Sequence, residues 1–181
     1  MKAMWTEMNS RLEALEEENR QMARRIINSN HKTAKDRLEK KYVTFIIIEF
    51  LMLAYIFFFI FQNPFVVEKY RLITVIYWTL FFLLEIGIDS FLYFQLKNLD
   101  IYGSSVTEIS KVARRNWKIH KIAIAIGIPI AIGAVILFAL ALDANEYTIF
   151  GMIFGAIIGL IIGLRQLFRF MKYYRNLQSE I

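Results

Sequence analysis

The fold of this chain is decided by a run of twenty residues, 42–61, that reads YVTFIIIEFLMLAYIFFFIF. Only Glu49 is charged within it. About 20 mainly apolar residues carry a helix across the hydrocarbon core of a bilayer, where lipid offers no partner for exposed backbone groups. The run follows a long charged segment and lacks a small-residue cleavage site, so it predicts a retained transmembrane helix and not a signal peptide.

Three further apolar segments are long enough to span, which agrees with an apolar content of 57% against about 45–50% in soluble domains. Polar residues at 62–64 and 143–146 separate the spans into two tight hairpins. We therefore predict an all-α fold, a four-helix transmembrane bundle over residues 42–171. A segment at 1–41 precedes it and a tail at 172–181 follows it. The predicted spans are 42–61, 72–96, 119–142 and 147–164.

The basic residues predict the orientation, because Lys and Arg are retained on the cytoplasmic side of a membrane. Ten lie in the segment before the first span, six between the two hairpins and four from Arg165 onward, against two and none in the remaining loops. Both termini should therefore be cytoplasmic. The same flanking positions explain the net charge of +6 through lipid head groups, so no nucleic-acid partner is expected.

The N-terminal segment carries a heptad pattern with apolar residues at gaps of three and four, which is the spacing of a coiled-coil seam. A single buried Asn in such a seam fixes register and favours two strands. The pattern predicts an amphipathic helix that needs a partner: a second copy, the central loop, another protein or the membrane surface. We call these residues the seam: Trp5, Met8, Leu12, Leu15, Asn19, Met22 and Ile26.

Two local features adjoin the spans. The polar triplet 28–30 predicts a break between the seam helix and a basic linker that ends at Lys41. Between the hairpins, Ser105 and Glu108 form a capping-box pattern that predicts a short basic helix with Trp117 as an interfacial anchor.

Three acidic residues interrupt the spans: Glu49 in the first, and Glu85 with Asp89 in the second. Spaced four apart, the last two share one helix face. An isolated carboxylate in hydrocarbon costs several kcal/mol, so all three should face the bundle interior, either protonated or paired. They predict either a proton or cation site, with Arg165 or His120 as a counter-charge, or hydrogen bonds that fix helix packing through groups such as Thr79, Ser90 and Tyr93.

Small residues mark the last two spans. Glycines at intervals of four form a glycine-zipper pattern, and small-xxx-small faces let helix backbones approach closely. The pattern predicts close packing between these two spans, with a homodimer through the glycine face as the alternative. The residues are Gly151, Gly155, Gly159 and Gly163 in the fourth span, and Ala123, Gly127 and Ala131 in the third.

No catalytic pattern is present. With no cysteine and only His31 and His120, the chain has no zinc-binding spacing and no Ser/His/Asp or Cys/His constellation. The glycines lie in an apolar helix and not between a strand and a helix, so they do not predict a phosphate site. We therefore expect no enzyme activity, no metal and no cofactor.

The N-terminal stretch MWTEMNSRLEALE, residues 4–16, resembles a group of small Bacteroidetes membrane proteins encoded beside extracytoplasmic-function sigma factors. The resemblance implies an anti-sigma factor in the inner membrane of a bacterium, whose seam helix covers the polymerase-binding surface of the sigma factor. The chain departs from zinc-binding anti-sigma factors in lacking their motif. Two other functions stay open: a small transporter or ion-conducting oligomer that uses the three acids, and a membrane scaffold that dimerises through the seam.

Overall fold

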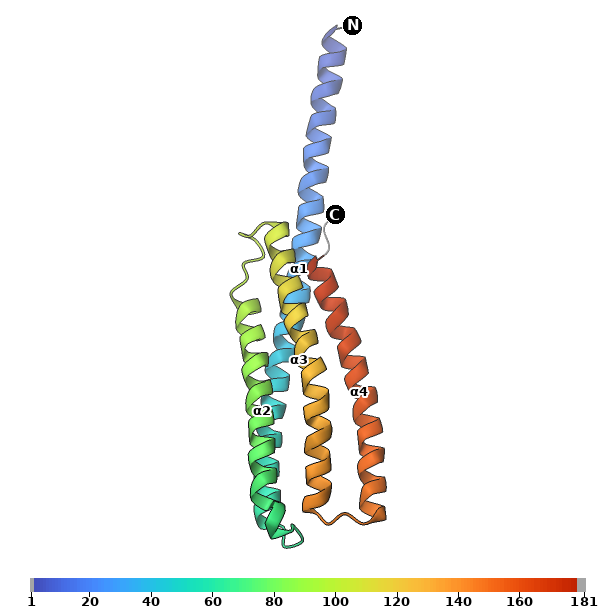
Figure 1. Ribbon diagram of the computed structural model, residues 1–181. Coiled ribbons are helices and arrows are strands. Elements are labelled where there is room, and N and C mark those ends of the chain that lie inside the picture. The colour runs from blue at the N-terminus through green and yellow to red at the C-terminus, as the bar shows by residue number, and fades with distance from the viewer. Residues whose placement is uncertain (1, 179–181) are drawn as a thin grey trace.

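The computed structural model describes residues 2–178 and consists of four helices: α1 (Lys2–Gln62), α2 (Glu68–Lys97), α3 (Val106–Ala141) and α4 (Glu146–Gln178). Consecutive helices run antiparallel (Figure 1). They close a ring, because α1 packs against α2 and α4, and α3 packs against the same two helices. The predicted four-helix fold is therefore confirmed, and all four helices are long and apolar enough to cross a membrane.

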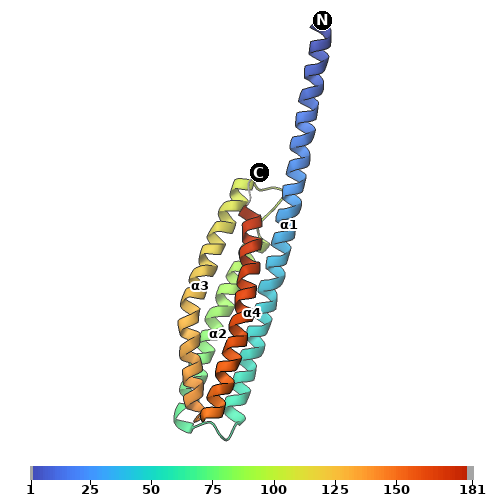
Figure 2. The same ribbon diagram turned by 90° about the vertical axis from the view of Figure 1, so that its right-hand side faces the viewer.

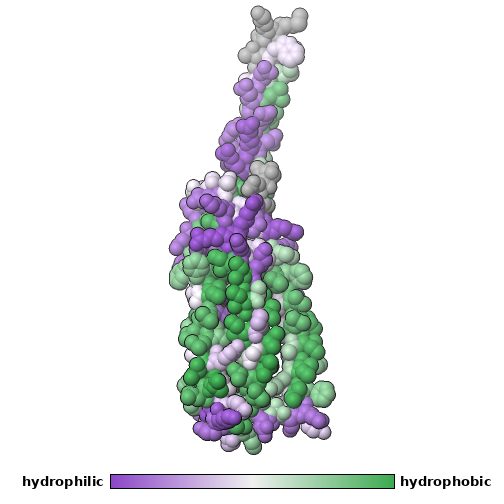
Figure 3. All heavy atoms as spheres, in the orientation of Figure 1, coloured by the Kyte–Doolittle hydropathy of each residue, from purple (hydrophilic) through white to green (hydrophobic). Residues whose placement is uncertain are grey.

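The surface of the bundle is apolar where a bilayer would surround it. Figure 3 shows hydrophobic side chains over the middle of the bundle and hydrophilic side chains at both ends. In α4, none of the residues in the most apolar eighteen-residue window is buried. Exposed apolar surface on this scale marks contact with lipid or protein, so the helices direct most of their apolar side chains outward.

The buried residues form two clusters that differ in which helices they join. The first lies at the end of the bundle from which the N-terminal part of α1 projects, which we call the arm-side end. It joins all four helices, through residues such as Leu38, Leu92, Ile109 and Phe170. The second cluster lies at the far end and is built from α1, α2, α3 and the loop before α2, and Ile60 is fully buried in it. The buried residues of α4 all belong to its arm-side part.

Helix α1 is continuous from the seam to the first span, so the predicted break at residues 28–30 is wrong. Residues 2–30, which we call the arm, extend beyond the bundle as one straight projection (Figures 1 and 2). Asn and Ser cost a helix only a few tenths of a kcal/mol each. His31 is fully buried directly after the triplet, and the Thr33 hydroxyl donates to the Ser29 carbonyl within the helix.

The helix predicted between the hairpins exists, but it is the first part of α3 and not a separate element. Its predicted start is confirmed, because Ser105 is the N-cap and its hydroxyl accepts from the Glu108 backbone N–H. Trp117 is partly buried and packs against the arm-side cluster. Helices α2 and α4 also extend beyond their predicted spans. Helix α4 continues through residues 172–178.

A lysine of α1 fixes the end of α2. The Lys35 ammonium donates to the Lys97 carbonyl at 3.2 Å and to the Leu99 carbonyl at 2.7 Å. Carbonyls at a helix C-terminus lack intrahelical partners and carry partial negative charge, so a cation is stabilising there. This contact ties α1 to α2 at the base of the arm.

Candidate functional site

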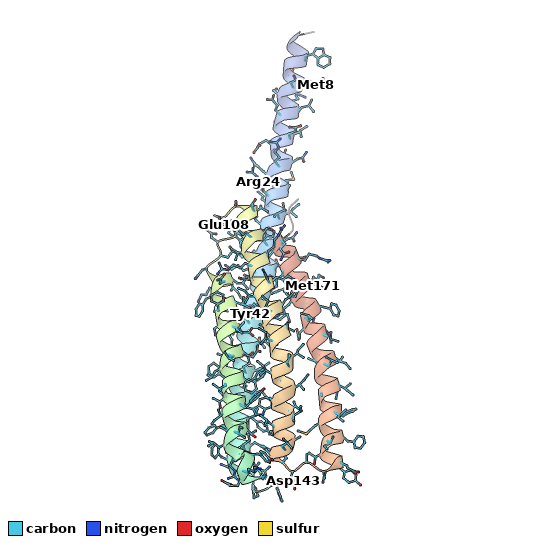
Figure 4. The ribbon with its side chains drawn as sticks, in the orientation of Figure 1. Met8, Arg24, Tyr42, Glu108, Asp143 and Met171 are labelled. Carbon is cyan, nitrogen blue, oxygen red and sulfur yellow. The ribbon has the colours of Figure 1, made fainter. Side chains whose placement is uncertain are left out.

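The structure leaves the whole seam uncovered. Its six apolar side chains are between 45% and 62% exposed, and Asn19 is exposed as well. Among the described residues, neither the loop before α3 nor any other segment packs on them, which removes the central loop as the seam's partner. Figure 4 shows the side chains near Met8 and Arg24 standing clear of the bundle.

The arm is stabilised locally by exposed ion pairs one turn apart. Arg11 lies 2.6 Å from Glu7, and Arg20 lies 4.0 Å from Glu16. Such pairs contribute only about 0.3–0.5 kcal/mol each. They do not replace a packed seam, because most helix stability in proteins comes from burying an apolar face.

The direction of the seam is fixed by the bundle, because α1 has no break. The buried face of α1 begins with His31, Ala34, Leu38 and Tyr42. Continuing the seam at the same gaps of three and four leads to the opposite face, where every position is exposed. The seam therefore points away from the chain's own bundle as it enters the first span. These continuing positions are Ser29, Thr33, Asp36, Lys40, Val43 and Ile47.

The three predicted intramembrane acids meet around one cavity. Glu49 approaches from α1, and Glu85 with Asp89 from α2, and all three line a cavity of about 360 Å³. His120 of α3 lines the same cavity. The sequence therefore predicted the grouping of the acids correctly and named one of the two candidate counter-charges that the structure places beside them.

The acids lack the hydrogen bonds that the packing hypothesis requires. Asp89 is 7% exposed, and among the described residues none donates a hydrogen bond to it or pairs with it. The buried Oε2 of Glu49 likewise has no hydrogen-bond partner among the described residues. In the described part of the chain, no hydrogen bond joins any of the three carboxylates to Thr79, Ser90 or Tyr93.

Arg165 is not the counter-charge, so that candidate is wrong. Its side chain is exposed and lines a shallow surface depression with Ile161, Phe168 and other outward residues of α4. Gln166, the next residue, faces the cavity instead. An angular step of about 100° per residue separates the two faces, and the apolar pattern of α4 did not reveal which one turns inward.

The glycine face does not pack within this bundle. A Cβ atom built on Gly151, Gly155, Gly159 or Gly163 would meet no atom within 4 Å. The predicted close packing against the third span is therefore wrong here, whereas a homodimer through this face stays a prediction.

Two glycines of the third span, Gly127 and Gly133, face α2. A Cβ on Gly127 would lie 2.8 Å from Glu85 Oε1, and a Cβ on Gly133 would lie 2.7 Å from Tyr77 Oη. Ala123 lines the acidic cavity, and Ala131 is partly buried. The close approach that the small residues permit is therefore made to the second span.

A buried aromatic cluster beside the cavity was missed by the sequence reasoning. The hydroxyls of Tyr42 and Tyr174 lie 2.8 Å apart, and Tyr42 Oη lies 3.5 Å from His120 Nδ1. His120 stacks on Phe170 with ring centroids 4.7 Å apart and on Trp117 with ring centroids 5.7 Å apart. The sequence did contain a signal for this cluster. Tyr42 and His120 lie at the start of the first and third predicted spans, and therefore at a similar depth in the membrane.

The cluster joins α1, α3 and α4. Figure 4 places Tyr42 in the arm-side half of the bundle. No family model, curated protein or solved structure matches this chain.

Proposed function

We propose that this chain is a membrane-tethered regulatory interaction protein. In this proposal the bundle lies in a bacterial cytoplasmic membrane with both termini in the cytoplasm, and the seam binds a helix of a cytoplasmic partner. The observation that carries the proposal is the uncovered seam on a continuous helix that extends beyond its own bundle.

The energetics favour occupation of the seam. Burying one apolar side chain of this size contributes about 1.5–3 kcal/mol, and six such side chains of the seam are exposed. An isolated helix of this length is marginal in water. A partner helix would stabilise the arm as well as bind it, because both seams would leave water together.

The reach of the arm suits a soluble partner. From His31 to Trp5 the helix extends about 39 Å at 1.5 Å per residue, which carries the seam beyond the lipid head groups. The resemblance to membrane proteins encoded beside extracytoplasmic-function sigma factors makes a sigma factor the first partner to test. Packing of the seam on its polymerase-binding surface would hold it inactive at the membrane.

The test is affinity capture of the tagged, full-length protein from its native membranes. The variant Leu12→Asp with Leu15→Asp places two charges in the seam. The matched control, Ala14→Asp with Gln21→Asp, adds the same charge on the opposite face of the arm. A sigma factor or other soluble regulator lost only from the seam variant supports the proposal, and identical captures from both variants contradict it.

A second copy of the chain is the second candidate occupant, favoured by the charges beside the seam. A membrane holds two copies parallel, and in a parallel pair Arg11 of one arm would face Glu16 of the other, at g and e positions. The two Asn19 side chains would meet at the same level of the seam.

Because the chain has no cysteine, single introduced thiols test this directly. Under oxidation, Leu12→Cys should give a cross-linked dimer and the outward Ala14→Cys should not. Equal cross-linking of both variants would exclude a symmetric seam.

A further inference from the structure

The cavity between the acids is built by all four helices. Its walls include Phe45 of α1, Ala123 and Ile124 of α3, and Leu167 with Phe170 of α4. Against this largely apolar lining stand three carboxyl groups, from Glu49, Glu85 and Asp89, together with His120 and Gln166. The volume of about 360 Å³ lies at the small end of the range for ligand sites, about 300–1,000 Å³.

The charges around the cavity are unbalanced. Among the described lining residues there is no Lys or Arg. The Lys41 ammonium donates to the side-chain oxygen of Gln166, which lines the cavity. His120 is 9% exposed, and its Nδ1 lies beside the Tyr42 hydroxyl.

Asp89 gives the clearest indication that the partner of the acids comes from outside the chain. Its side chain is more than nine-tenths buried, lines the cavity and has no hydrogen-bond or ion-pair partner within the described chain. A buried carboxylate is costly unless it is paired. A cation in the cavity would supply the counter-charge that no side chain there provides.

The lining selects the kind of cation. No group of three or more His, Asp or Glu side chains in residues 2–178 has a geometry that holds a metal ion. Phe45 and Phe170, whose rings stack with centroids 5.7 Å apart, line the cavity with the acids and add to its apolar wall. Apolar walls with carboxylates on one side therefore fit an organic ammonium ion with an apolar body.

The glycine face supplies the entrance. Gly159 and Gly163 of α4 line the cavity and are exposed, and a Cβ at either position would meet no atom within 4 Å. Side chains at these positions would fill the part of the cavity wall that α4 contributes. Their absence leaves the acids accessible from the apolar phase, which suits a lipophilic ligand.

We propose that the cavity between Glu49, Glu85, Asp89 and His120 is a binding site for a lipophilic organic ammonium ion that enters past the glycine face of α4. The ammonium can belong to a free amine or to a lipid head group. This inference goes beyond the interaction function of the arm, and neither depends on the other.

The test uses the full-length protein in nanodiscs of phosphatidylglycerol, which has no ammonium group. The probe is radiolabelled benzyltrimethylammonium, measured by equilibrium dialysis. Its neutral isostere, neopentylbenzene, is the competitor that separates charge from shape. We expect one saturable site per chain, and at least tenfold weaker competition by the neutral isostere than by unlabelled probe.

Two kinds of variant locate the site. Asp89→Asn and Glu49→Gln should weaken binding at least tenfold. Gly163→Leu keeps every acid but fills the entrance, and should also weaken binding tenfold. Gly151→Leu is the matched control, because Gly151 lies on the same face outside the cavity, and should bind as the unmodified chain does.

The outcomes divide cleanly. Absence of saturable binding, equal binding of the charged and neutral probes, or wild-type affinity in Gly163→Leu would overturn the proposal. Adding phosphatidylethanolamine identifies the source of the ammonium: competition assigns the site to a lipid head group, and its absence assigns it to a free amine. Partner capture by the arm is measured separately, so failure of one proposal is distinguishable from failure of the other.

Discussion

Removal of one hydroxyl from the Tyr42–Tyr174 pair should destabilise the bundle by a predictable amount. Both side chains are fully buried and their hydroxyls lie 2.8 Å apart. Leaving a buried polar group unpaired costs about 1–3 kcal/mol. Tyr42→Phe should cost more than Tyr174→Phe, because the Tyr42 hydroxyl also lies beside His120 Nδ1, whereas Tyr174 has no second hydroxyl partner among the described residues.

The double variant measures the interaction itself. Tyr42→Phe with Tyr174→Phe should lose less than the sum of the single changes, by about 0.5–1.5 kcal/mol, since removing both partners leaves no orphaned hydroxyl. Unfolding by SDS in mixed micelles gives the four free energies. Tyr147→Phe, at a side chain that is 87% exposed, is the control and should change stability by less than about 0.5 kcal/mol. Additive losses, within about 0.3–0.5 kcal/mol, would refute the buried hydrogen bond.

Three further changes test the arm, the contact between α2 and α3, and the loop before α3. Ser29→Pro should cost about 3 kcal/mol of helix stability and uncouple the arm, seen as broadened distances between spin labels on arm and bundle. Unchanged distances would contradict a continuous helix. Gly133→Ala should cost about 1 kcal/mol in the SDS assay because its Cβ displaces the Tyr77 hydroxyl, while Gly151→Ala should be neutral or stabilising. Backbone N–H groups in the loop before α3 lower the pKa of the Asp100 carboxyl. The ionised Asp100 should therefore stabilise the fold above the ordinary Asp pKa of about 3.9, and this stabilisation should be lost as the pH falls through the lowered pKa. Asp100→Asn should remove that part of the pH dependence, and an unaltered pH profile would contradict it.

The fold was predictable because membrane insertion depends on few properties. A run such as 42–61 meets the length and apolarity that a span requires, whatever its neighbours are. The seam was predictable for a similar reason, because heptad spacing is a local property of the sequence. The grouping of Glu85 with Asp89 follows from one helical turn.

The errors arose where tertiary packing decides. The triplet before His31 resembles a loop in composition, but burial of His31 at the base of the arm favours a continuous helix. Arg165 and Gln166 are neighbours on α4, and only the rotation of that helix decides which faces the acids. Gly163 belonged to a pattern that predicts close packing, whereas the packed part of α4 begins only at Phe170.

The continuity of α1 connects the two proposed sites physically. One helix carries the seam, Tyr42 in the arm-side cluster and Glu49 at the cavity, with no break among its residues. About 56 Å of helix separate Tyr42 from Trp5 at 1.5 Å per residue. A tilt of about 5° around Tyr42 would therefore move the seam's end by about 5 Å. If an ammonium ion drew Glu49 toward the other acids, the arm would move with it, whereas Ser29→Pro would abolish that movement and leave ammonium binding intact.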